Sequence, residues 1–127
     1  MGDAQSVAEV LERAADLIEP DGRWTRGAFS RNADGSADLD DEALAASEPV
    51  CWCGLGAIAQ TLRVDSLKGR LWSRLDTGLT GQAYRLLNEV VGTDFPDWND
   101  APERTQAEVV AKLREAAALA RTKGDAA

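Results

Sequence analysis

The stretch Pro49-Val-Cys-Trp-Cys-Gly-Leu-Gly-Ala-Ile-Ala-Gln-Thr-Leu62 decides the fold, because it is the only long run without a charged residue. The whole sequence has a formal net charge of −8. On a helix, large apolar side chains would form one stripe of this run and small residues the opposite side, so neither face suits water. Gly54 and Gly56 would let neighbouring backbones approach closely, at a helix-propensity cost of about 1 kcal/mol each. We therefore expect a helix that is buried on all sides and around which the other elements pack.

Apolar residues at helical spacing predict a long helix before this run. It extends from Val7 to Ile18. Ser6 and Glu9 form a capping box at its start, in which each side chain satisfies a backbone amide. The turn sequence Pro20-Asp-Gly22 ends this helix.

The C-terminal half contains two more predicted long helices. In the first, an apolar stripe runs from Ala83 to Val91, and Gly92 is its C-cap. Before this helix, Gly78 and Gly81 are expected to bracket a turn.

The last helix begins at a second capping box, Thr105-Gln-Ala-Glu108. Glu108 and Lys112 have the spacing of an i, i+4 ion pair. We expect Gly124 to end this helix.

The other segments are predicted to be short or irregular. Trp24 and Phe29 would anchor the segment after the first helix to the core, since large aromatic residues contribute most when buried. Residues 31–36 would form a turn, as at the tip of a short hairpin, because Asp-Gly tolerates positive φ. Short helices are predicted over residues 38–46 and 65–75.

These elements predict a mainly α fold with a single helical domain over residues 1–127, ordered from about residue 4 to residue 122. The expected architecture is a compact bundle of about four principal helices around the central buried helix. One or two short helices, and an irregular or hairpin segment after the first helix, complete it.

Composition and charge exclude several classes of function. The 22 acidic and 14 basic residues disfavour binding to nucleic acid or to an anionic membrane, both of which need clustered basic side chains. The absence of histidine excludes Ser-His-Asp and Cys-His catalysis and the commonest zinc ligand sets. No signal peptide is visible and the uncharged run is too short to span a bilayer, so we expect a cytoplasmic protein.

Cys51 and Cys53 are the only thiols. A cysteine near a helix N-terminus can have a lowered pKa and act as a nucleophile or redox group. At i, i+2 on a helix, however, the two sulfurs would point in nearly opposite directions, so neither chelation nor a relaxed disulfide follows. Two small, buried and reduced residues are therefore the expectation.

The sequence from Ser30 to Asp41 has the spacing of a calcium-binding EF-hand loop. Its first position is serine, its last is the weaker ligand aspartate, and no helix is evident before it. We expect an acidic turn and no bound metal or cofactor. The candidate metal ligands, if the loop did bind calcium, are Asn32, Asp34, Asp38 and Asp41.

The segment from Asp94 to Asp100 concentrates three carboxylates, an amide and two aromatic rings between two helices. It could be a ligand-binding or metal-binding loop. Alternatively, the polar side chains bond the loop's own amides while the aromatic rings are buried. The candidate binding residues are Asp97, Trp98, Asn99 and Asp100.

Three motifs occur in a familiar order. They are Trp24-Thr-Arg-Gly-Ala-Phe29, Cys53-Gly-Leu-Gly-Ala57 and Trp98-Asn-Asp100, the last followed by Thr105, Val109 and Leu113. On these motifs the chain resembles a small family found in actinobacteria and their phages, domain of unknown function 6197. Residues 63–80 depart from the pattern. The resemblance implies a small, mainly helical domain in a bacterial or phage setting, and it implies no catalytic residues.

Three functional hypotheses follow. The first is a non-enzymatic module that binds another protein, favoured because no catalytic constellation, phosphate loop or basic patch is present. The second is a small-molecule or metal-binding protein, or a thiol enzyme, that uses the Asp94–Asp100 loop or Cys51 and Cys53. The third is an acidic mimic of nucleic acid that acts on a basic host protein.

Overall fold

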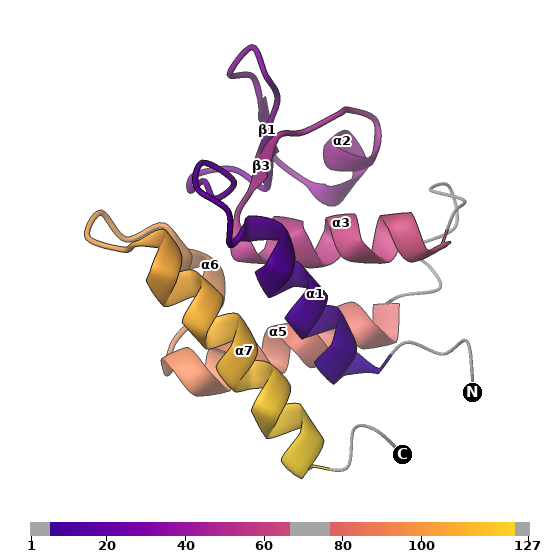
Figure 1. Cartoon of the computed structure of the whole chain (residues 1–127), viewed down its shortest axis with the longest axis vertical. Coiled ribbons are helices and arrows are strands. Elements are labelled where there is room, and N and C mark those ends of the chain that lie inside the picture. The colour runs from indigo at the N-terminus through magenta and orange to yellow at the C-terminus, as the bar shows by residue number, and fades with distance from the viewer. Residues whose placement is uncertain (1–5, 67–76, 124–127) are drawn as a thin grey trace.

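The computed structural model describes residues 6–66 and 77–123 and confirms a mainly helical protein with a small sheet. Among these residues, four long helices form the body, and the sheet with one short helix stands at one end (Figure 1). The elements, in chain order, are α1 (Val7–Ile18), β1 (Ser30–Arg31), β2 (Ala37–Asp38), α2 (Asp41–Ala45), β3 (Cys51–Trp52), α3 (Gly54–Ser66), α5 (Thr77–Val91), α6 (Phe95–Asn99) and α7 (Gln106–Thr122). The helix predicted over residues 65–75 lies mostly outside the described residues.

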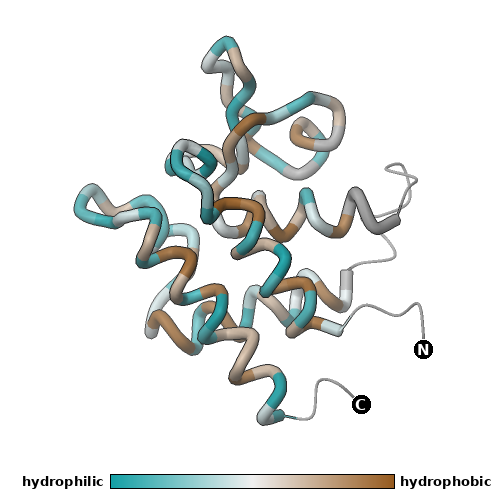
Figure 2. Tube along the Cα trace, viewed as in Figure 1, coloured by the Kyte–Doolittle hydropathy of each residue, from teal (hydrophilic) through white to brown (hydrophobic). Residues whose placement is uncertain are grey.

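Helix α1 makes the most extensive helix–helix contacts, chiefly with α7 and α3 and also with α5. Its predicted apolar stripe is buried, apart from the half-buried Leu17. Ser6 caps it as expected, accepting a hydrogen bond from the backbone N–H of Glu9 at 3.0 Å. The core is therefore built around α1 as well as around the uncharged run. Figure 2 shows apolar residues recurring along each long helix, whereas the hairpin tip is hydrophilic.

Helix α3 is buried on nearly every side, as predicted. From Gly54 to Leu62, only Leu55 and Gln60 are half-buried and every other residue is buried. The two glycines are needed for close packing, since a Cβ at Gly54 would lie 2.5 Å from the Phe95 ring and one at Gly56 would collide with the carbonyl of Phe29. The close approach inferred from these glycines is thus confirmed.

The prediction that this helix includes Cys51 is wrong, because residues 51–52 form strand β3 and α3 begins at Gly54. β3 pairs antiparallel with β1, with Ser30 opposite Trp52 and Arg31 opposite Cys51. The backbone N–H of Cys53 also donates to the Phe29 carbonyl at 3.0 Å. Cross-strand hydrogen bonds to a segment some 20 positions away therefore override the local helical pattern.

The predicted hairpin and short helix are both present. β1 pairs antiparallel with β2, and the strand order of the sheet is β2-β1-β3. Gly35 has a φ of 88° in the turn, the left-handed conformation expected of the Asp-Gly sequence. Asp40 caps α2 by accepting the N–H of Ala43 at 2.8 Å.

The predicted turn at Gly78 and Gly81 is wrong, since both glycines lie inside α5. Neither has positive φ. The helix buries Ala83 and its neighbouring leucines, and that burial outweighs a propensity cost of about 1 kcal/mol per glycine. Gly92 ends the helix as predicted, with a φ of 80°.

The capping box at the start of α7 is confirmed, because Thr105 and Glu108 exchange side chain–backbone hydrogen bonds. The predicted ion pair of Glu108 with Lys112 is wrong. Glu108 lies 3.5 Å from Arg104, and Lys112 pairs with Glu115 at 2.9 Å. The capping box directs the Glu108 carboxylate back toward the N-terminus of the helix, away from Lys112. Within the described residues, no helix has the length and apolar character needed to cross a membrane.

Candidate functional site

The three sequence motifs meet at one place in the fold, where the segment after α1, the start of α3 and helix α6 adjoin. We call this place the motif junction and define it as residues 24–29, 53–57 and 95–100. The junction brings together candidate residues that the sequence places up to about 75 positions apart.

Asn99 is the centre of the junction and is 1% exposed. Its Oδ1 accepts hydrogen bonds from the backbone N–H of Gly54 at 3.2 Å and from Nε1 of Trp24 at 3.1 Å. Its Nδ2 donates to Oδ1 of Asp100 at 3.0 Å and to the carbonyl of Thr25 at 3.4 Å. The prediction that this side chain bonds the backbone amides of its own loop is therefore wrong, since within the loop it bonds only the Asp100 carboxylate and its other partners are Gly54, Trp24 and Thr25. Asn99 instead satisfies a backbone amide at the start of α3 from a different helix.

Asp100 and Arg26 each link the segment after α1 to the segment at the end of α6. Asp100 bonds the backbone of the first segment, and Arg26 bonds the backbone that follows α6. Oδ1 of Asp100 accepts the backbone N–H of Gly27 at 2.9 Å, and Gly27 has a φ of 81°. Nη1 of Arg26 donates to the carbonyls of Ala101 and Arg104 at 2.8 and 3.2 Å. Polar side chains thus hold the connection between α6 and α7 against the segment that follows α1.

Trp98 is half-buried, so the prediction that it lies buried beneath the loop is only partly met. Its ring stacks on Phe95 with centroids 5.7 Å apart, and the Arg104 guanidinium lies 3.8 Å from its centroid. Phe95, rather than Trp98, is the completely buried aromatic residue of α6. Asp97 is exposed on the same short helix.

Three of the four candidate calcium ligands, Asn32, Asp34 and Asp38, are held by hydrogen bonds in and near the hairpin. Oδ1 of Asp34 accepts the N–H and hydroxyl of Ser36 at 3.0 and 2.7 Å, and these bonds lower the pKa of Asp34. Asp38 is buried, and its Oδ2 accepts the hydroxyl groups of Ser30 and Ser47 at 2.7 and 2.9 Å.

Asn32 donates to both carboxylate oxygens of Asp38, and Asp41 is the first residue of α2. Among the described residues, no group of three or more histidine, cysteine, aspartate or glutamate side chains is placed to hold a metal ion. The acidic spacing that resembles an EF-hand therefore folds the hairpin onto α2.

The two thiols have different environments. Cys53 is 8% exposed, and its Sγ accepts the backbone N–H of Gly56 at 3.3 Å at the start of α3. Burial raises the pKa of Cys53 from 9.0 to about 11, so this thiol is protonated at neutral pH. Cys51 is only half-buried, in β3, so the prediction that both thiols are largely buried holds for Cys53 alone. Both cysteines are free.

A small pocket of about 180 Å³ opens at the junction, and we call it the junction pocket. Its polar side chains belong to Cys53, Asn99 and Asp100. Its larger apolar side chains are those of Phe29, Leu39, Leu55, Phe95 and Pro96.

Leu39 is the functional candidate that the sequence did not reveal. It is 71% exposed, although it lines the junction pocket. Residues 32–50, in which it lies, contain six carboxylates and no lysine or arginine. The sequence signal for Leu39 is its position between Asp38 and Asp40. A large apolar side chain is unusual in a solvated acidic segment and can mark a binding surface.

The chain was compared with family models, curated proteins and solved structures. The model of the family of unknown function DUF6197 matches residues 3–119, so the chain belongs to this family. Neither curated proteins nor solved structures gave a match.

Proposed function

We propose that this family member is a non-enzymatic module that binds another protein at the junction pocket. The observation that carries the proposal is Leu39, a large apolar side chain that is 71% exposed at the rim of an apolar pocket. Exposed apolar surface beside a concave site is typical of protein–protein recognition.

The polar groups of the pocket support binding rather than chemistry. Cys53 is protonated at neutral pH, and a thiol needs to ionise to act as a nucleophile. Both the acceptor and the donor atoms of Asn99 are already occupied by protein partners. What the pocket offers to a partner is therefore its apolar wall.

The size of the pocket indicates what kind of group enters it. A volume of about 180 Å³ is below the range of roughly 300–1,000 Å³ typical of small-molecule sites. It suits one apolar side chain of a partner. Because residues 32–50 carry six carboxylates and Asp100 lies at the pocket, lysine or arginine residues next to that side chain would complement the surface.

An acidic nucleic-acid mimic is the second candidate function. The same six carboxylates without a basic residue favour it, since a mimic presents negative charge to a basic protein. The two functions predict different effects of salt and of a Leu39 substitution on binding. A mimic would depend on charge alone and its binding would collapse with salt, whereas the junction pocket would depend on Leu39.

The test is selection of peptides from a random displayed library on the immobilised protein. We expect enrichment of a bulky apolar residue flanked by lysine or arginine, and an affinity about tenfold lower for Leu39→Ser. Val50→Ser is the matched control, because Val50 is 46% exposed in the same acidic segment and does not line the pocket.

Each outcome of the selection has a clear meaning. Peptides that bind Leu39→Ser as well as the native protein would contradict the proposal. If those peptides are purely basic and dissociate at about 0.5 M salt, the result supports the acidic mimic instead.

A further inference from the structure

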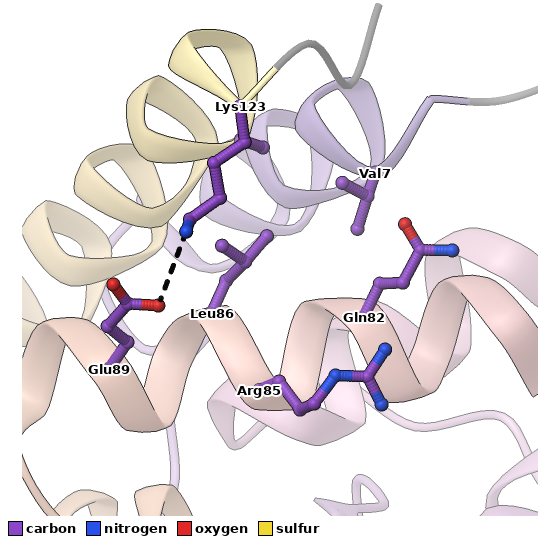
Figure 3. A pocket seen from close by; sticks show the side chains of 7 residues that line it. Val7, Gln82, Arg85, Leu86, Glu89 and Lys123 are labelled. Carbon is purple, nitrogen blue, oxygen red and sulfur yellow. Dashed lines mark ion pairs between the residues drawn. The ribbon is translucent and has the colours of Figure 1, made fainter.

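A second pocket lies between three helices, away from the junction. Its charged residues are mainly basic, whereas residues 32–50 beside the junction pocket are acidic. We call the second pocket the three-helix pocket. It has a volume of about 300 Å³ and is bounded by the start of α1, one face of α5 and the end of α7 (Figure 3). Its floor consists of Val7, Leu86 and Ala120, all of them buried.

Charged and polar side chains surround this apolar floor. Gln82 and Arg85 project from neighbouring positions of α5, while Glu89 and Lys123 approach each other at the other side of Leu86 (Figure 3). The Glu89–Lys123 pair is long, at 4.0 Å, and both side chains are more than half exposed. Two cations and one carboxylate give the pocket a net charge of about +1, in a chain whose net charge is −8.

Arg85 has an unused guanidinium. Within residues 6–66 and 77–123, no hydrogen bond or ion pair is made by this side chain, whereas Arg26, Arg104 and Arg114 all bond to protein groups. A guanidinium presents N–H donors in a planar fork that matches a carboxylate. The Gln82 amide beside it can supply a further donor.

We propose that the three-helix pocket binds a small monocarboxylate with a short apolar body. The carboxylate is held by Arg85 and Gln82, and the apolar body covers Leu86 and Val7. A monoanion fits better than a phosphate, because Glu89 repels additional negative charge and because the floor is apolar. The volume is at the lower end of that found for small-molecule sites.

Glu89 has a specific role in this arrangement. It competes with the ligand for Lys123, since its carboxylate already lies near that ammonium group. Removing its charge with Glu89→Gln releases Lys123 and lowers the repulsion of an anion. The proposal therefore predicts one substitution that weakens binding and another, one turn away, that strengthens it.

The experiment is an NMR titration of backbone amides at constant ionic strength with three probes of similar length: hexanoate, 1-hexanol and hexylammonium. We expect saturable shifts of residues around the pocket with hexanoate and none with the other two probes. Arg85→Ala should weaken hexanoate binding about tenfold, and Glu89→Gln should tighten it roughly threefold. Arg121→Ala is the matched control, because this arginine lies on α7 and pairs with Glu12 outside the pocket.

Three outcomes would overturn the proposal: no saturable shift with hexanoate, equal shifts with 1-hexanol, or unchanged hexanoate binding in Arg85→Ala. The exposed position of Arg85 makes unfolding of the variant unexpected, and its amide spectrum checks this directly. Leu39→Ser should leave hexanoate binding unchanged. Failure of the carboxylate site is thereby separated from failure of the proposed protein-binding function.

Discussion

The long helices and the motif junction are held together by different kinds of interaction. In the helices, apolar stripes supply the packing, and the capping hydrogen bonds join residues three positions apart. In the junction, polar side chains bond groups 45 to 75 positions away in the sequence. A helix of this protein is thus specified mostly by its own residues, whereas the junction exists only when three separate segments have come together.

This difference predicts which substitutions the protein tolerates. A polar side chain of a long helix, such as Arg114, bonds groups that remain partly exposed to water, so its loss costs a limited amount. In the junction a single side chain such as Asn99 satisfies several buried or half-buried groups at once, so its loss leaves several of them unpaired. Four experiments test this comparison.

The largest difference is expected between two glycine substitutions. Gly56→Ala would place a Cβ against the carbonyl of Phe29, and backbone there has little room to move, so we expect a loss of about 3 kcal/mol or more. Gly81→Ala, in the interior of α5, meets only the flexible end of Arg85 at 3.6 Å and should stabilise the protein by about 0.5–1 kcal/mol. Urea unfolding of both variants measures this. Similar stabilities would show that the α3 contact is not constrained.

Asn99→Ala should cost about 2–3 kcal/mol, because the N–H of Gly54 and the indole of Trp24 lose their shared acceptor. The control is Asn32→Ala, whose bonds are confined to the nearby hairpin and which should cost less than about 1 kcal/mol. Urea midpoints of the two variants compare them. Equal losses would contradict the distinction between local and long-range polar bonds.

The Cys53 thiol should make the protein sensitive to alkali. Its pKa is raised by burial to about 11 in the folded state, above the ordinary value of 9.0, so the folded protein binds this proton more tightly than the unfolded chain. The resulting stability is fully present below pH 9 and is lost as the pH rises through 11. We expect a loss of about 2 kcal/mol between these two values.

The check on Cys53 is unfolding measured from pH 8 to pH 11 for the native protein and for Cys53→Ala. The variant should show a shallower fall of stability with pH, whatever its stability at pH 8. Identical slopes would mean that Cys53 ionises in the folded state much as it does in the unfolded chain.

The smallest effect is expected from an ion-pair network between two helices. Arg114 of α7 bonds Glu12, Asp16 and Glu19 of the α1 region at 2.8–3.0 Å, but these side chains are 31–67% exposed. Solvent screening leaves such pairs a small contribution, so Arg114→Ala should cost about 0.5–1 kcal/mol, and less at 1 M salt. Thermal unfolding at low and high salt measures it. A loss as large as that of Asn99→Ala would remove the contrast between the two regions.

The long helices could be predicted because their information is local. The apolar stripe from Val7 to Ile18, the Ser6 cap and the capping box at Thr105 are all formed by residues within or next to the helix that they specify. Predictions were wrong where hydrogen bonds to a distant segment override the local residue pattern. Cys51 has a helical environment in sequence, yet hydrogen bonds to β1 make it a strand residue.

The candidate site was predicted only in part. Its residues were recognised, since Trp98, Asn99 and Asp100 stood out as a polar and aromatic group, but their partners were not. Nothing near Asn99 in the sequence indicates that its amide reaches Gly54 and Trp24. The exposure of Leu39 was likewise not predicted, because it depends on how the acidic segment packs beside α6.

The sequence by itself determined the helical class, the caps of α1 and α7, the end of α5 at Gly92, the hairpin turn and the burial of residues 54–62, because these depend on residue spacing and local hydrogen bonding. Only the tertiary structure decided where α3 begins, which groups Asn99 and Asp100 bond and which side chains surround the two pockets. Those features depend on distances between segments far apart in the chain, and such distances are settled only when the hydrophobic core has formed.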